Sequence, residues 1–226
     1  MLGQARAETS AEQCSRFASD PLESGHEASG IDLNKIDLSK ALPSCIEAAF
    51  SPLATPQDHF RLSRAYYAAH QVELAASEAA KSANAGYPPG MYVYAILLKD
   101  GEGVERDEAA AVQFFASAAK MNFVEAEAAL GEMIWNGQGI GKNKQLGVQW
   151  LNKAAKGGSS SAVHSLEEIA RVEAVNQANA RVGTWGLCKR DQFQQAMRNQ
   201  QNYDGQRSSV DDGLTTGFSG PDGTCQ

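Results

Sequence analysis

Residues 100–104 read Asp-Gly-Glu-Gly-Val, and residues 136–140, thirty-six positions later, read Asn-Gly-Gln-Gly-Ile. The same offset separates Ala118-Ala119-Lys120 from Ala154-Ala155-Lys156. A constant offset of this size, carried by small and apolar residues at matched positions, is the mark of helical units that stack in one dimension. The sequence therefore predicts a repeat protein built from helices.

Apolar residues between the repeated segments have the spacing of one buried helix face. Residues 111–119 and 147–155 place them at i, i+3, i+4, i+7 and i+8, and earlier copies occur at 75–83 and, more faintly, 41–49. This spacing indicates four second helices of helix hairpins. First helices are expected at about 14–19, 57–69, 89–99 and 125–136, with an unpaired helix from Ser161 onward.

The Gly-x-Gly step between the helices of a pair has a physical cause. A helix that ends in a left-handed residue needs glycine there to avoid a Cβ clash, and a second glycine lets the chain double back tightly. Asp107 and Asn143 follow at the next helix start, where a short polar side chain can cap free amide hydrogens. In the first full pair this loop is shortened to His70-Gln71.

Composition and charge exclude several classes of partner. The chain has 226 residues and a net charge of −7, and no block of lysine or arginine occurs in it. The electrostatic footprint of a nucleic-acid or anionic-membrane binder is therefore missing, and a basic protein partner fits better. No stretch of about eighteen uncharged apolar residues is present to span a bilayer.

The cysteines flank the repeats. Cys14, Cys45, Cys188 and Cys225 contain no Cys-x-x-Cys pair, which argues against a zinc site. Their placement favours two local disulfides, Cys14 with Cys45 and Cys188 with Cys225, although three pairings are possible and four thiols are the alternative. Ala5-Arg6-Ala7 is similar to the end of a secretory signal whose apolar part is missing from this sequence. Together these features point to a periplasmic or secreted bacterial protein.

One family matches these residues. Leu130-Gly131-x-x-Ile134-x-x-Gly137-x-Gly139-Ile140, followed by Val148-x-Trp150-Leu151-x-Lys153-Ala154-Ala155-x-x-Gly158, resembles the Sel-one-like repeat (SLR), a relative of the tetratricopeptide repeat. The resemblance implies an all-α fold, a right-handed α-solenoid of stacked antiparallel helix hairpins with irregular N- and C-terminal caps. It also implies a scaffold for protein partners whose first helices line a concave face. It implies no chemistry.

Three regions are expected on this basis: an N-terminal cap with a degenerate helix pair at 8–56, the repeat solenoid at 57–180, and a C-terminal cap with a Gly-rich tail at 181–226. The chain changes character after Val182, and a polar helix is expected from Arg190 to Gln201. Beyond Tyr203 the composition indicates flexibility unless Cys225 holds the tail.

Positions of the first helices that packing does not use are the candidate partner-binding residues. Trp135 is the sharpest, because aromatic side chains are frequent interface anchors, although it could instead pack on the neighbouring repeat. Arg64 could engage a carboxylate on a partner or lie solvated. The predicted set is Arg64, Tyr67, Tyr92, Ile96, Lys99, Glu132 and Trp135.

Catalytic and metal-binding patterns give little support to an enzyme. His26, His59, His70 and His164 lie in no recognised spacing with a nucleophile or a metal partner, so no catalytic residue, metal or cofactor is expected.

The expected function is a non-catalytic envelope scaffold that grips a protein partner, as an immunity protein of a secreted toxin or as an envelope regulator. Two alternatives stay open. One is a cell-wall-acting hydrolase or penicillin-binding enzyme of the cysteine-rich Sel-one-like type. The other is a C-terminal segment around Trp185 that occupies the groove as an internal ligand.

Overall fold

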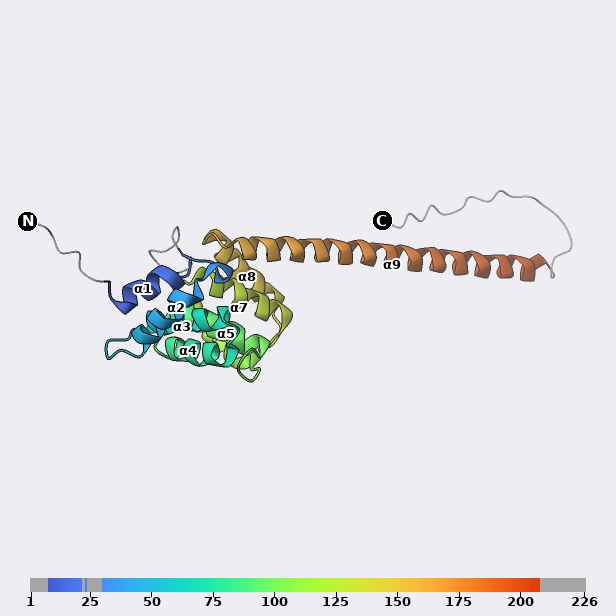
Figure 1. Cartoon of the computed structure of the whole chain (residues 1–226). Coiled ribbons are helices and arrows are strands. Elements are labelled where there is room, and N and C mark those ends of the chain that lie inside the picture. The colour runs from blue at the N-terminus through green and yellow to red at the C-terminus, as the bar shows by residue number, and fades with distance from the viewer. Residues whose placement is uncertain (1–7, 22, 24–29, 208–226) are drawn as a thin grey trace, which may run out of the picture. The chain divides into compact units, whose positions relative to one another are not determined.

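The computed structural model describes residues 8–21, 23 and 30–207 (Figure 1). Within these residues the regular structure is helical, which confirms the all-α prediction. The elements, in chain order, are α1 Ser10–Ala18, the 3₁₀ helix η1 Leu33–Lys35, α2 Leu38–Ala49, α3 Pro56–Ala68, α4 Val72–Asn84, α5 Pro88–Asp100, α6 Glu108–Lys120, α7 Val124–Asn136, α8 Lys144–Lys156 and α9 Ser160–Arg207.

The helices from α1 to α8 pack as sequential hairpins. The pairs are α1 with α2, α3 with α4, α5 with α6, and α7 with α8, and each second helix also packs on the next first helix. First helices contact one another as well, α1 with α3 and α3 with α5. This order is that of the predicted stack, in which each unit meets its neighbours along one direction.

Helix boundaries follow the predicted caps. Asp107 accepts a hydrogen bond from the backbone N–H of Ala110 at 2.9 Å, and Asn143 accepts one from Leu146 at 3.0 Å. Gly101 ends α5 at φ 75°, and Gly137 ends α7 at φ 79°. Both values lie in the left-handed region that glycine adopts without a Cβ clash.

The second glycine of each Gly-x-Gly step has a further role. A Cβ on Gly103 would lie 2.1 Å from the carbonyl oxygen of Val72, and one on Gly139 would lie 2.2 Å from that of Glu108. Val72 and Glu108 begin the second helices of the preceding units. The backbone of each loop therefore packs against the first residue of the second helix in the preceding repeat. A side chain on the glycine would prevent this contact.

Small residues bring the two helices of each unit close together. In the α5–α6 hairpin, Ala95 and Ala111 are fully buried within a cluster centred on Phe115. At the equivalent positions of α7 and α8 the chain has Gly131 and Gly147, and a Cβ on Gly147 would lie 2.8 Å from the carbonyl oxygen of Gly131. The backbones there approach closely because neither residue carries a side chain.

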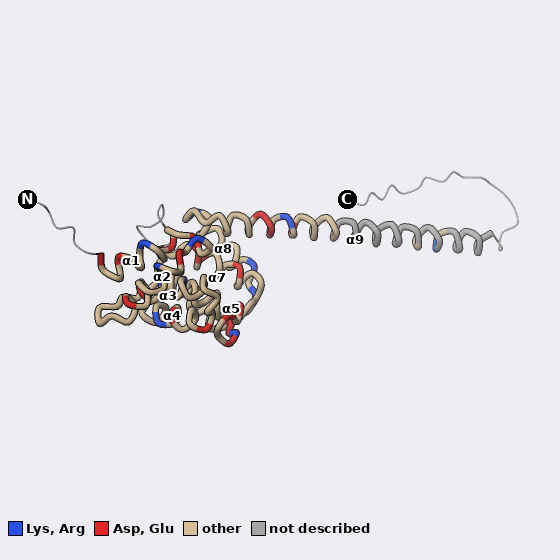
Figure 2. Tube along the Cα trace, viewed as in Figure 1, with Lys and Arg blue, Asp and Glu red and all other residues tan. Residues whose placement is uncertain are grey.

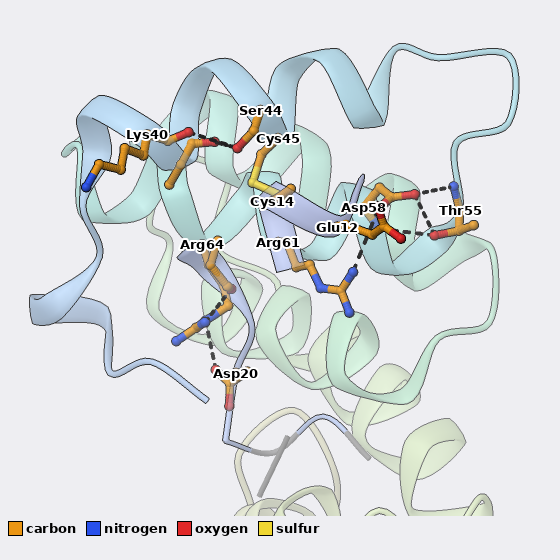
Figure 3. Close-up of a disulfide and its surroundings, with 12 residues drawn as sticks. Glu12, Cys14, Asp20, Lys40, Ser44, Cys45, Thr55, Asp58, Arg61 and Arg64 are labelled. Atoms are coloured by element: carbon orange, nitrogen blue, oxygen red, sulfur yellow. Dashed lines mark hydrogen bonds and ion pairs between the residues drawn. A yellow bond between two sulfur atoms is a disulfide. The ribbon is translucent and has the colours of Figure 1, made fainter. Parts of the chain in front are cut away.

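The N-terminal cap is tied down by the predicted disulfide between Cys14 and Cys45, whose Cα atoms are 4.6 Å apart (Figure 3). Both cysteines are fully buried, between α1 and α2. The bridge lies within the buried apolar cluster of the cap and closes a loop of 31 residues, which restricts the unfolded chain and so stabilises the fold.

α9 extends through the position after Val182 at which the sequence changes character. One helix runs from Ser160 to Arg207 and includes the expected polar segment from Arg190 to Gln201. Thirty-six residues beyond Gly137 and Gly139 the sequence has Glu173 and Val175 in place of glycine. The left-handed helix end is therefore unfavourable at this point, and the helix continues.

The chain divides into two units, residues up to Leu166 and residues from Glu167 on, and the repeats lie in the first. Several predicted features fall outside the described residues: Ala5-Arg6-Ala7, the Gly-rich tail and Cys225. The side chains of Cys188 and Trp185 are outside the description as well, so the second predicted disulfide and the internal-ligand alternative stay predictions.

Candidate protein-binding surface

The first helices α3, α5 and α7 have thirteen residues each, so their positions can be matched directly. We call the residues at positions five, nine and twelve of these helices the inner face, because the predicted partner-binding residues fall at these positions. Position nine holds Arg64, Ile96 and Glu132, and position twelve holds Tyr67, Lys99 and Trp135. Position five holds Phe60, Tyr92 and Ala128.

Arg64 is not available to a partner, which corrects both expectations for this residue. Its side chain is 4% exposed, and its guanidinium forms an ion pair of 2.8 Å with Asp20. It also donates to the backbone carbonyls of Ala18 and Ile31, each at 2.6 Å. Burial lowers the pKa of Arg64 while the charge of Asp20 opposes that shift. Figure 3 shows the Arg64 side chain directed at Asp20.

A second arginine holds the same segment. Arg61 donates to Glu23 at 2.7 Å, and the Glu23 carboxylate, only 2% exposed, also accepts from the backbone N–H of Asp20. Burial raises the pKa of the Tyr87 hydroxyl above its usual value, and the negative charge of Glu23 adds to the shift. The N-terminal residues Asp20 and Glu23 are therefore anchored on α3 through Arg64 and Arg61.

The inner face over α5 is aromatic and apolar. The ring of Tyr92 lies 5.8 Å from Phe115 and 5.6 Å from Phe123, centroid to centroid, and Ile96 is half-buried beside the same cluster. Burial raises the pKa of Tyr92, with further contributions from the charges of Glu125 and Glu132. This part of the surface presents a packed hydroxyl next to carboxylates.

Over α7 the inner face is held by polar contacts. Trp135 is half-buried, and the ammonium of Lys144 lies 4.7 Å from its ring centroid. Its backbone and Cβ pack against Gly147 of α8. Glu132 accepts a hydrogen bond from the hydroxyl of Ser165. Trp135 thus packs on α8 of its own hairpin and stays partly exposed. Ala128, at position five of α7, is buried.

At the edge of the inner face, Lys99 pairs with Asp100 at 3.3 Å and Tyr67 donates to Glu102 at 2.7 Å. A pocket of about 860 Å³ opens beside Tyr67. Sequence reasoning missed this pocket, because the η1 segment and the α5–α6 loop that line it are far apart in the chain and neither carries a recognised motif. Its lining residues are Leu33, Asn34, Ile36, Leu38, Tyr67, Ala68, His70, Val72, Gly101, Glu102 and Gly103.

Charged residues are scattered over the repeats without a block of either sign (Figure 2). Among the residues that the structure describes, no group of three His, Cys, Asp or Glu side chains could hold a metal ion. Within the same residues, no helix is both long and apolar enough to cross a membrane. The Nδ1 atom of His59 lies within hydrogen-bond distance, 2.7 Å, of the buried carboxylate of Glu78.

Comparison with known families decides what kind of scaffold this is. The Sel1 repeat matches residues 88–123 and again residues 124–159, two consecutive units of thirty-six residues. Residues 88–159 of the chain are therefore two consecutive Sel1 repeats. The matched units begin at the first residues of α5 and α7, which confirms the resemblance read from the sequence. Such a scaffold typically serves protein–protein interaction.

A curated relative is chitin synthase regulatory factor 3 of Schizosaccharomyces pombe, with 35% identity over 92 residues. The match covers 40% of this chain and 10% of that protein, so the chain spans about a tenth of the relative's length.

Three solved structures are similar to this chain. A Sel1 repeat protein from Oxalobacter formigenes has 26% identity and a TM-score of 0.48, covering 55% of this chain and 54% of that one. A protective antigen of uropathogenic Escherichia coli with an SLR fold has 26% identity and a TM-score of 0.46, covering 59% and 27%. Cysteine rich protein B of Helicobacter pylori has 21% identity and a TM-score of 0.46, covering 59% and 96%.

Proposed function

We propose that this Sel1-repeat protein is a non-catalytic scaffold that binds a protein partner through the inner face of α5 and α7. The observation that carries the proposal is the half-buried row formed by Tyr92, Ile96 and Trp135, whose side chains are fixed by packing but still reach the surface. Rigid aromatic surface is buried on binding at little cost in side-chain entropy.

The charges beside this row favour a partner with basic residues. Glu125 and Glu132 both raise the pKa of Tyr92, so their negative charges act at this part of the surface. The whole chain carries a net charge of −7. Complementary charge speeds encounter and excludes acidic competitors more than it adds affinity.

We place the protein outside the cytoplasm, in the envelope of a bacterium or secreted from it. The support is the buried disulfide between Cys14 and Cys45, a bond that persists in oxidising compartments. A partner in that compartment would be a secreted toxin that the protein neutralises or an envelope protein that it regulates. Deleting the gene separates the two roles, since loss of a toxin inhibitor makes cells sensitive to their own toxin.

The test uses the full chain as bait for extracts of the native envelope. We expect Trp135→Ala and Ile96→Ala each to weaken capture of the partner at least tenfold, because a central anchor contributes ~2 kcal/mol or more. Leu74→Ala is the matched control, since Leu74 is an apolar residue 48% exposed on the second helix α4. Urea titration of each variant checks that it is folded.

A protein retained by the wild-type chain and Leu74→Ala but lost from both inner-face variants would support the proposal. Equal capture by all four chains would rule out the inner face as the binding surface.

A further inference from the structure

The pocket beside Tyr67 is distinct from the row over α5 and α7. Its lining comes from η1 and the start of α2 in the N-terminal cap, and from the Gly-x-Gly loop after α5. Its volume of about 860 Å³ lies in the range of sites that hold small ligands or short peptide segments.

Most of the lining is apolar. Ile36 and Leu38 contribute aliphatic side chains from the cap, and Ala68 and Val72 contribute them from the α3–α4 turn. Leu33 is 42% exposed at the same site, a large apolar side chain that lies in contact with solvent in the isolated chain. An occupant with an apolar group would remove this surface from water.

The polar side chains of the pocket lining are Asn34, Tyr67, His70 and Glu102, and the carboxylate is that of Glu102. Glu102 accepts a hydrogen bond from the Tyr67 hydroxyl at 2.7 Å. That hydrogen bond is the largest cause of a raised pKa of Tyr67, and the charges of Glu102 and Asp100 contribute as well. Asp100 pairs with Lys99, whereas no lysine or arginine in the described part of the chain forms an ion pair with Glu102.

The loop that carries Glu102 is preorganised. Gly101 and Gly103 on either side are both left-handed, at φ 75° and 67°, and Gly103 rests against the carbonyl of Val72. Glu102 is therefore presented by a constrained backbone, which reduces the entropy lost when a ligand binds. The matching residue in the Gly-x-Gly loop of the next repeat is Gln138. Of these two loops, only the one at residues 101–103 therefore carries a charge at this position.

We propose that this pocket binds a short segment of a protein partner in which an arginine or lysine lies next to an apolar residue. The cation pairs with Glu102 at the rim, and the apolar side chain packs on Leu33, Ile36 and Val72. The inference rests on the proposed protein-binding function, but it uses residues outside the row over α5 and α7.

The experiment is an NMR titration of the ¹⁵N-labelled full chain with three blocked tripeptides, acetyl-Leu-Arg-Leu-amide, acetyl-Leu-Gln-Leu-amide and acetyl-Leu-Glu-Leu-amide. We expect saturable shifts of the amides of Gly101, Glu102, Gly103 and His70 with the arginine peptide. Its affinity should exceed that of the glutamine peptide about fivefold, the ratio that ~1 kcal/mol produces, and exceed that of the acidic peptide further.

Two variants test whether the Glu102 carboxylate causes the preference for the arginine peptide. Glu102→Gln should abolish the preference for arginine over glutamine while leaving the apolar contribution, and Glu105→Gln, at an exposed acid of the same loop outside the pocket lining, should leave the preference intact. Shifts spread over other surfaces, or equal affinity of the arginine and acidic peptides, would overturn the inference. Partner capture that still depends on Trp135 and Ile96 would show that the proposed function stands even when the pocket fails.

Discussion

Replacing Gly103 with alanine should destabilise the repeats, and the matching change at Gly139 should have a similar effect. An alanine at φ 67° costs about 1–2 kcal/mol. The new Cβ would also lie 2.1 Å from the carbonyl oxygen and 2.4 Å from the carbonyl carbon of Val72, which are backbone atoms that move only with their helix. Overpacking of this kind costs about 1–3 kcal/mol, so the free energy of unfolding should fall by about 3 kcal/mol.

Two other glycines separate these contributions. Gly86 also has a positive φ, 85°, but a Cβ there would meet nothing within 4 Å, so Gly86→Ala should show the conformational cost alone. Gly141 has neither constraint, and Gly141→Ala should be neutral or stabilise by about 0.4–1 kcal/mol by restricting the unfolded chain.

The assay is urea unfolding of the full chain followed by tryptophan fluorescence, which reports on Trp135 and Trp150 within the repeats. A parallel thermal scan should show a decrease of about 6–12 °C for Gly103→Ala, from 2–4 °C per kcal/mol in a chain of this size. A Gly103→Ala variant that is no less stable than Gly86→Ala would refute the role assigned to the contact with Val72.

Three further changes test the N-terminal cap. Arg64→Met should lower the free energy of unfolding by about 3–5 kcal/mol in the same urea assay, because it leaves Asp20 and two backbone carbonyls without their buried cation; a loss below 1 kcal/mol would contradict this. The Cys14→Ala/Cys45→Ala variant should lose about 3–4 kcal/mol, as expected for opening a 31-residue loop, and an unchanged urea midpoint would count against it. The raised pKa of Tyr87 means that the folded chain keeps a proton that the unfolded chain loses near pH 10, so stability should be full below that pH and decline above it. Urea titrations between pH 8 and pH 11 should show a shallower decline for Tyr87→Phe, and parallel curves would contradict the assignment.

The stack was predictable from sequence because its determinants are local and recur. The first helices α5 and α7 end at a left-handed glycine, and the second helices α6 and α8 begin at an Asp or Asn cap. The thirty-six-residue offset repeats both signals. Asn122 extends the rule, since it adopts φ 61° where Gly86 and Gly158 stand in the neighbouring units. Asparagine is one of the few other residues that tolerate this conformation.

The burial of Arg64 could not be predicted from the sequence in the same way. Its partners are backbone carbonyls 46 and 33 residues away and a carboxylate in an irregular segment, and none of these belongs to a periodic pattern. Arginine on a predicted helix surface is usually solvated. Contacts with Ala18, Asp20 and Ile31 make this one buried. The pocket beside Tyr67 was not predicted for a related reason. It is lined by the N-terminal cap and by a repeat loop, which are far apart in the sequence.

The recurring contacts of Gly103 with Val72 and of Gly139 with Glu108 make each thirty-six-residue unit an interchangeable module with a standard joint. Splicing a second copy of residues 124–159 after Ser159 would present the duplicate's glycine to Lys144, the residue that begins α8. The length of the stack is therefore set by the number of such units, and duplication can extend it while keeping this contact between neighbours.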